Sequence, residues 1–181
     1  MQVDLSKFDN SRYKPGRSAL AQAAWFFIGL PLLRCPIIPS SLFRVKLLRA
    51  FGASIGQGVV VKPGVRVKYP WHLQIGNNSW LGEDCWIDNL APVRIGNNVC
   101  VSQGAYLCTG SHDWSDPSFG LITKPITLQD GAWVGARAII CPGVELEQNG
   151  IAALGSVVTR SIPAGEIHMG NPANHVRQRE A

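Results

Sequence analysis

Residues 75–102 read IGNNSWLGEDCWIDNLAPVRIGNNVCVS, and the unit Ile-Gly-Asn-Asn occurs in them twice, at Ile75 and at Ile95. Six positions after the isoleucine of each unit stands another aliphatic residue, Leu81 after Ile75 and Val101 after Ile95. A period of six fits neither an α-helix, which repeats about every 3.6 residues, nor a strand, whose side chains alternate. It is typical of short strands joined by sharp turns, three to a coil.

The same spacing continues on both sides of this stretch. With two slips of two residues and one longer break, the aliphatic positions run from Ile55 to Val158, and the repeat ends near Pro163. They are Ile55, Val61, Val67, Ile75, Leu81, Ile87, Ile95, Val101, Leu107, Leu128, Val134, Ile140, Leu146, Ala152 and Val158. An irregular β-sandwich would not keep this period. The sequence therefore predicts an all-β fold, a parallel β-helix of about five coils with the aliphatic residues inside.

Two further columns of residues agree with this fold. The residue after the aliphatic position is often glycine, as at Gly76 and Gly96, and asparagines follow it at Asn77, Asn78, Asn97 and Asn98. We expect these residues to supply the backbone of the turns. The residue four places after the aliphatic one is mostly small or β-branched, which suits a tight corner where a large side chain would clash.

Composition and charge exclude several classes of protein. The five cysteines (Cys35, Cys85, Cys100, Cys108 and Cys141) are widely spaced, which favours small apolar fillers in a reducing cytosol over disulfides or a zinc site. No apolar run is long enough to span a membrane, and the N-terminus lacks the pattern of a signal peptide. The net charge of +5 is concentrated in residues 1–50, so the body of the protein lacks a basic nucleic-acid-binding face.

The N-terminal segment, residues 1–51, precedes the β-helical domain of residues 52–181. It contains an apolar stretch, Ala19–Leu33, and a second predicted helix, Leu42–Phe51, which Ser40 or Ser41 caps and Gly52 ends. We interpret this segment as a cap over the open first coil, because solenoids need their ends covered. A second hypothesis is that its apolar and basic residues also rest on an anionic membrane surface.

The repeat units, with Trp133-Val134-Gly135-Ala136-Arg137 and the closing motif Gly170-Asn171-Pro172-Ala173, resemble the hexapeptide-repeat acyltransferases. Within that superfamily the chain resembles galactoside and maltose O-acetyltransferases, and most of all the colanic acid biosynthesis acetyltransferases of the WcaF type. The resemblance covers roughly residues 52–178. It implies a left-handed coil, a homotrimer with active sites between subunits, and acetyl-CoA as the donor, with no tightly bound cofactor.

The repeat breaks once, between Leu107 and Leu128, which predicts a protruding loop near 112–127. Long loops in compact domains are often functional. His112 stands at its root, where similar enzymes place a catalytic histidine, and imidazole is suited to take a proton from an acceptor hydroxyl. The alternative is a loop histidine that makes a structural hydrogen bond. His72, His168 and His175 lack the spacing of metal ligands, so we predict no metal site.

Asp88 lies one coil before the break and is the first candidate to orient His112, ahead of the alternatives Asn89, Asp84 and Asp113. We assign Asp84, Asn89 and Trp114 to binding of the acceptor. The resemblance also exposes two departures, because an acceptor-binding Asn of the sugar-acetylating relatives falls on Gly82 here and an acceptor-binding Asp falls on Leu90. The acceptor is therefore held differently from a small galactoside or maltose.

The donor side follows the resemblance more closely. Carried over by position, the residues that contact CoA are Trp133, Gly135, Ala136, Leu154, Gly155, Thr159, Arg160 and Arg177. A backbone N–H near Gly135 and Ala136 would stabilise the thioester oxygen. Arg160 and Arg177 suit the phosphates of CoA, although either is equally consistent with an ordinary surface arginine. Asn174 stands where relatives often have a basic residue.

The sequence thus predicts an acetyl-CoA-dependent O-acetyltransferase that acts on a sugar hydroxyl in exopolysaccharide biosynthesis. It is expected to be cytoplasmic, with possible peripheral contact at the inner face of the membrane. The alternatives are an acetyltransferase for another acceptor, such as an amino sugar, serine or an antibiotic, and a non-catalytic β-helix scaffold.

Overall fold

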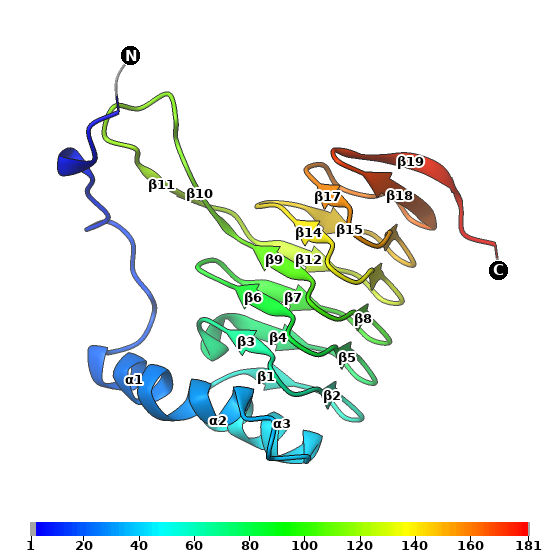
Figure 1. Ribbon diagram of the computed structural model, residues 1–181, viewed down its shortest axis with the longest axis horizontal. Coiled ribbons are helices and arrows are strands. Elements are labelled where there is room, and N and C mark those ends of the chain that lie inside the picture. The colour runs from blue at the N-terminus through cyan, green and yellow to red at the C-terminus, as the bar shows by residue number, and fades with distance from the viewer. Residues whose placement is uncertain (1–2, 181) are drawn as a thin grey trace.

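A computed structural model of the chain describes residues 3–180, and its strands stack into a parallel β-helix with three faces (Figure 1). Face A is formed by β1 (Ser54–Ile55), β4 (Leu73–Ile75), β7 (Val93–Ile95), β12 (Ile126–Leu128) and β15 (Glu145–Leu146). Face B is formed by β2 (Val60–Val61), β5 (Trp80–Leu81), β8 (Cys100–Val101), β13 (Trp133–Val134), β16 (Ile151–Ala152), β18 (Glu166–Gly170) and β19 (Ala173–Gln178). Face C is formed by β3 (Arg66–Val67), β6 (Trp86–Asp88), β9 (Tyr106–Cys108), β14 (Ile139–Ile140) and β17 (Val157–Val158).

The six-residue period is the repeat of this solenoid. Ile55 pairs with Ile75 and Ile75 with Ile95, each one coil further along face A. After the break, Ile95 pairs with Leu128, so the register resumes as the period predicts. Of the fifteen aliphatic positions, all but the half-buried Ile55 are buried. The predicted β-helix is confirmed.

Asn78 and Asn98 supply the turn backbone as expected, because both have a positive φ. Gly76 does not have a positive φ and has a different role. A Cβ at Gly76 would lie 2.6 Å from the carbonyl carbon of Gly96 in the next coil. Glycine stands there because successive coils approach too closely for any side chain.

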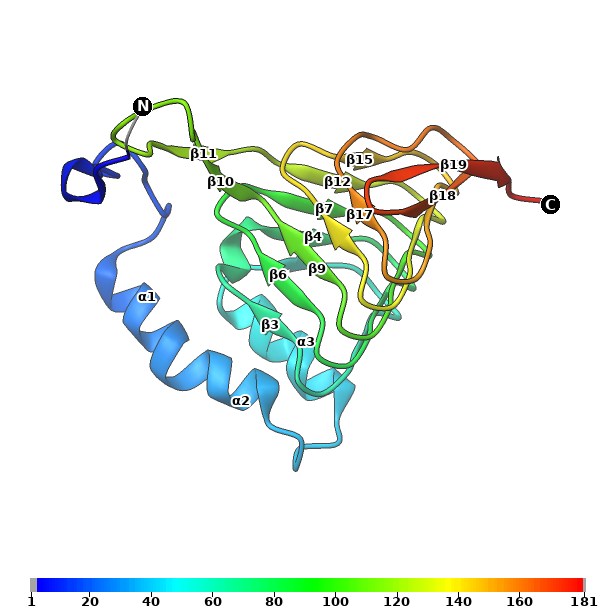
Figure 2. The same ribbon diagram turned by 45° about the horizontal axis from the view of Figure 1, so that its top comes forward.

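The N-terminal segment covers the first coil with helices (Figure 2). A short 3₁₀ turn (Leu5–Lys7) comes first, and α1 (Ala19–Ala24), a π-helical turn (Trp25–Gly29) and α2 (Leu30–Arg34) then follow one another without a break. Next comes α3 (Ser41–Ala50), which begins at Ser40 as its cap; a further 3₁₀ turn (Pro70–His72) precedes β4. Trp25, Leu33 and Leu48 are fully buried in one cluster with the first coils, so the helices close the open end of the solenoid.

Arg44 of α3 is buried inside this cap. Its guanidinium donates to the carbonyl oxygens of Leu33, at 3.1 Å, and Cys35, at 2.9 Å. These bonds satisfy a buried charge and join the end of α2 to α3. In the part of the chain that the structure describes, no helix is both long enough and apolar enough to cross a membrane.

Candidate active site

The break in the repeat forms a β-hairpin that projects from the solenoid, from β10 (Gly110–His112) to β11 (Leu121–Thr123) (Figure 1). It leaves at the corner between faces C and A. Thr109 anchors its base, because its hydroxyl donates to the carbonyl of Asp88 at 2.9 Å and accepts from the N–H of Ala91 at 3.0 Å. Lys124 N–H closes the base by donating to the carbonyl of Thr109. The predicted loop is therefore an ordered arm with a rigid root.

His112 ends β10, and its ring is oriented by the hairpin itself. Nδ1 lies 2.8 Å from the carbonyl oxygen of Phe119. A carbonyl oxygen only accepts hydrogen bonds, so Nδ1 carries the proton and Nε2 of the neutral ring keeps its lone pair. The ring of Phe119 also stacks on the imidazole, with centroids 4.3 Å apart and planes 6° apart. Both contacts fix the ring in the form that a general base requires.

Phe119 adopts a backbone conformation that is rare for a bulky residue. Its φ is +53°, in the left-handed region that favours glycine. This conformation belongs to the residue whose carbonyl and ring both contact His112. Sequence reasoning missed Phe119, because a carbonyl contact leaves no signature in the side-chain pattern.

Asp88 does not orient His112 in this structure. As predicted, it lies one coil below, opposite Cys108 of β9. Its carboxylate pairs with Lys68 Nζ at 3.0 Å and accepts the hydroxyl hydrogen bond of Tyr106 at 3.2 Å. Burial raises the pKa of Tyr106, so this hydroxyl keeps its proton. The expectation that Asp88 fixes the tautomer is corrected, since the Phe119 carbonyl does so.

Two residues that we assigned to the acceptor are placed elsewhere. Asn89 is completely buried, and its amide accepts from the N–H and donates to the carbonyl of Tyr69, so it joins two coils. Asp84 lies at the corner between faces B and C, against the α2 side of the molecule, whereas His112 follows the corner between C and A. Within one subunit, Asp84 is therefore at a different corner from His112, and Asn89 is enclosed between two coils.

Trp114 remains near His112. It is 81% exposed on the arm, and together with His112, Lys124 and Pro142 it lines a shallow cavity of about 250 Å³. A larger cavity of about 760 Å³ lies between the arm, the N-terminal segment and the corner at Leu90. Leu121 lines this larger cavity and pairs across the hairpin with His112. His112 thus lines the smaller cavity, while its cross-strand partner Leu121 lines the larger one.

The residues expected to bind the donor lie on the later coils. Gly135, Ala136, Leu154 and Gly155 form the corner between faces B and C, where the Gly155 N–H donates to the Ala136 carbonyl at 2.9 Å. The Gly135 N–H is already bonded to the Ala152 carbonyl at 2.8 Å. Within residues 3–180 the Ala136 N–H has no such partner, so it is the amide of this pair that remains for an oxyanion.

The remaining residues assigned to the donor are spread over other parts of the later coils. Trp133 lies on face B, half exposed, and its indole donates to the Ser102 hydroxyl. Thr159 and Arg160 follow β17 at the corner between faces C and A, and Arg177 lies on the exposed strand β19. Leu154 is 74% exposed. The set thus presents two arginines and an apolar surface to solvent.

Cysteine and metal chemistry have little support at this site. Burial raises the pKa of the Cys85 thiol to about 12, and burial likewise raises the pKa of Cys141, which disfavours the nucleophilic thiolate in both. Among the described residues, no group of three or more His, Cys, Asp or Glu side chains is arranged to hold a metal ion.

Comparison with known proteins assigns the fold to a family. Residues 73–108 and 125–160 match the family described as "Hexapeptide repeat of succinyl-transferase". The chain is also 34% identical over 178 residues to the "Putative colanic acid biosynthesis acetyltransferase WcaF" of Escherichia coli K12, and the match covers 97% of each chain. This chain belongs to the hexapeptide-repeat acyltransferases. The galactoside O-acetyltransferase of Escherichia coli K12 is a more distant relative, 28% identical over 75% of this chain and 68% of that one.

Solved structures support the assignment of this chain to the hexapeptide-repeat acyltransferases. The maltose O-acetyltransferase of Clostridium difficile 630 superposes with a TM-score of 0.80 and 25% identity, over 91% of this chain and 90% of that one. A galactoside acetyltransferase in complex with coenzyme A superposes with a TM-score of 0.69 and 26% identity, over 78% of this chain and 73% of that one. The predicted family and enzyme class are confirmed, and a structural relative binds coenzyme A.

Proposed function

We propose that this acyltransferase moves the acetyl group of acetyl-CoA onto a sugar hydroxyl, with His112 as the general base. The observation that carries this proposal is the hydrogen bond from His112 Nδ1–H to the Phe119 carbonyl. It holds the ring in the tautomer whose Nε2 lone pair can accept a proton from a hydroxyl group.

The reaction requires only groups that the chain and its substrates supply. The acceptor oxygen attacks the thioester carbonyl carbon while its proton moves to Nε2 of His112. The oxyanion that forms would be stabilised by a backbone amide, for which the Ala136 N–H of an adjacent subunit is the candidate. When the C–S bond breaks, the CoA sulfur leaves and takes the proton back from the imidazolium, so no covalent acyl-enzyme is needed.

The donor would lie along the later coils. The two arginines of the set, Arg160 and Arg177, are suited to phosphate groups, and the exposed Leu154 and Trp133 offer apolar surface to the pantetheine arm. The relative solved with coenzyme A supports the choice of a CoA thioester as the donor. We propose a homotrimer with the active site between subunits, which would cover the large apolar side chains that the solenoid leaves exposed, such as Trp80 and Trp86.

For the acceptor, we propose a saccharide of exopolysaccharide assembly. The relative named for colanic acid biosynthesis supports this choice, because its match extends over 97% of both chains. The larger cavity, between the arm and the N-terminal segment, mixes charged, hydroxyl and apolar groups, as saccharide binding requires. Leu90 lines this cavity where an acceptor-binding Asp is expected from the resemblance, so recognition of the sugar depends on other groups.

The proposal is tested by following thiol release from acetyl-CoA with neutral sugars, uronic acids, amino sugars and serine as acceptors. We expect release that depends on a saccharide acceptor, and a product that hydroxylamine cleaves, since esters react and amides do not. An amide product would instead indicate an N-acetyltransferase. The absence of release with every acceptor, in protein that binds acetyl-CoA, would favour a non-catalytic scaffold.

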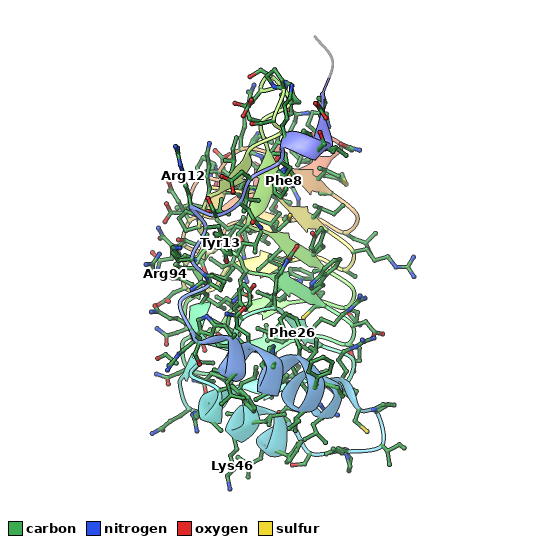
Figure 3. The ribbon with its side chains drawn as sticks, turned by 90° about the vertical axis from the view of Figure 1, so that its left-hand side faces the viewer. Phe8, Arg12, Tyr13, Phe26, Lys46 and Arg94 are labelled. Carbon is green, nitrogen blue, oxygen red and sulfur yellow. The ribbon has the colours of Figure 1, made fainter. Side chains whose placement is uncertain are left out.

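We also propose that the helical end of the acyltransferase rests on an anionic membrane surface. Leu20 and Phe27 are 81% and 80% exposed on the outer side of the α1–α2 helix, and Ile37 beyond it is 87% exposed. Arg34 and Lys46 are exposed at the same end of the molecule, and Figure 3 shows Lys46 pointing away from the solenoid there. An apolar surface bordered by cations matches the chemistry of an anionic lipid headgroup region.

Phe27→Glu is expected to weaken binding to vesicles of phosphatidylglycerol and phosphatidylcholine by about tenfold. It removes a ring that would be buried in the lipid and adds a negative charge that the anionic lipid repels. Co-sedimentation measures the binding. Val176→Glu, half exposed on β19 at the opposite end, is the matched control and should bind as the unmodified protein does. Equal binding by the two variants would contradict the proposal, as would a lack of binding by the unmodified protein.

A further inference from the structure

The segment before α1 runs along the outside of the solenoid and reaches the projecting arm (Figure 3). We name residues 4–15 the N-terminal strap. At its start the Asp4 N–H donates to the Pro117 carbonyl at 2.9 Å. In its second half the Tyr13 hydroxyl donates to the Leu90 carbonyl at 2.8 Å, and at its end the Pro15 carbonyl accepts from the Trp71 indole at 2.5 Å. The strap is therefore bonded both to the arm and to the coils beneath it.

Phe8 of the strap contacts the imidazole of His112. The ring centroids are 5.6 Å apart and the planes meet at 61°, the edge-on arrangement that aromatic rings prefer. Phe119 stacks on His112 at 4.3 Å. The imidazole of His112 is thus stacked against the Phe119 ring and lies edge-on to the Phe8 ring. Its Nδ1–H donates to the Phe119 carbonyl.

The strap also forms one wall of the larger cavity, whose other wall is the arm that carries His112. Arg12, Tyr13 and Lys14 line this cavity from the strap, and Leu121 and Thr123 line it from the arm. Burial raises the pKa of Tyr13, so its hydroxyl stays protonated and continues to donate to Leu90. Phe8 is consequently held in place by bonds on both sides of it in the sequence.

We propose that Phe8 is a positioning residue for His112, so that the N-terminal strap is a working part of the active site. This inference rests on the function proposed above. Phe8 limits rotation of the imidazole about its Cβ–Cγ bond and keeps Nε2 aimed at the acceptor hydroxyl. Small misplacements of a catalytic group are costly, because the reacting atoms must meet at near-bonding distance.

Phe8→Ala is expected to lower kcat about tenfold or more, with the KM for acetyl-CoA unchanged. Phe8→Tyr keeps an aromatic ring and should restore kcat. Leu5→Ala, on the same strap but 66% exposed, is the control and should leave kcat unchanged. The melting temperature of Phe8→Ala should stay near that of the unmodified chain, because Phe8 lies outside the core cluster.

A second measurement does not depend on acetyl transfer. Diethylpyrocarbonate modifies the free nitrogen of a neutral imidazole, and peptide mass spectrometry locates the modified histidine. Phe8→Ala should speed modification of His112 severalfold, and Phe8→Tyr should not. If modification accelerates while no acceptor supports thiol release, the positioning role stands and the proposed function fails. If Phe8→Ala alters neither kcat nor the modification rate, or if Phe8→Tyr lowers kcat as much as Phe8→Ala does, the positioning role is wrong.

Discussion

Replacing His112 with alanine is expected to lower kcat for acetyl transfer by a factor of about 10² to 10⁴, the usual contribution of a general base. The lone pair at Nε2 is the only feature of the ring that the Phe119 contacts leave for the substrate. Without it the acceptor hydroxyl must lose its proton to water. The same thiol-release assay measures the loss, and the KM for acetyl-CoA should change little.

Two variants sharpen this result. His175→Ala removes an exposed histidine on β19 and should leave kcat unchanged. Asp88→Asn should lower kcat by less than about tenfold, because Asp88 is paired with Lys68 and Tyr106 rather than with His112. Retention of full activity by His112→Ala would remove the general-base mechanism. A loss in Asp88→Asn equal to that in His112→Ala would return Asp88 to the role of orienting partner.

Gly76→Ala is expected to have the largest effect on stability, lowering the free energy of unfolding by about 3 kcal/mol or more. The added Cβ would lie 2.6 Å from the Gly96 carbonyl carbon and 2.7 Å from its oxygen, both of them backbone atoms of the next coil. The coils cannot separate there without breaking the bond from the Gly76 N–H to the Ile95 carbonyl, which is 2.8 Å long. Denaturant unfolding followed by circular dichroism measures the change.

The matched control is Gly104→Asn. Gly104 has a φ of +62°, and its nearest Cβ contact is the flexible Arg137 side chain at 3.4 Å. Asparagine tolerates this backbone conformation, so the expected loss is about 1 kcal/mol or less. Equal stability of Gly76→Ala and the unmodified chain would show that the coils can move apart, contrary to the close stacking described here.

The sequence predicted what the repeat imposes at every coil. A buried residue such as Leu107 belongs to a column of like residues, so its place follows from the period alone, and the one break in that period located His112. The partner of His112 could not be predicted in this way. The partner is the backbone carbonyl of Phe119, a group that any residue at that position would have. The positive φ that orients this carbonyl is not predictable from the local sequence.

The role of Asn89 could not be predicted from the sequence either. It stands beside Asp88 in a turn, where polar residues are usually solvated, yet its amide pairs with both backbone groups of Tyr69 in the previous coil. Phe8 was missed for a similar reason, because its contact with His112 joins segments far apart in the chain that no repeat relates. Donor residues such as Ala136 were easier to place, because they sit within the regular coils.

The pairing of Ile95 with Leu128 makes the register of the coils independent of the length and sequence of the arm between them. In a compact protein these two properties are usually coupled. The chain leaves the solenoid at Thr109 and returns at Lys124 in the register that an uninterrupted coil would have. Insertions, deletions or substitutions in the outer part of the arm, residues 113–120, can therefore accumulate without disturbing the ladder of coils. Changes in the arm can thus alter the surroundings of His112 while the coils that carry Gly135 and Ala136 keep their register.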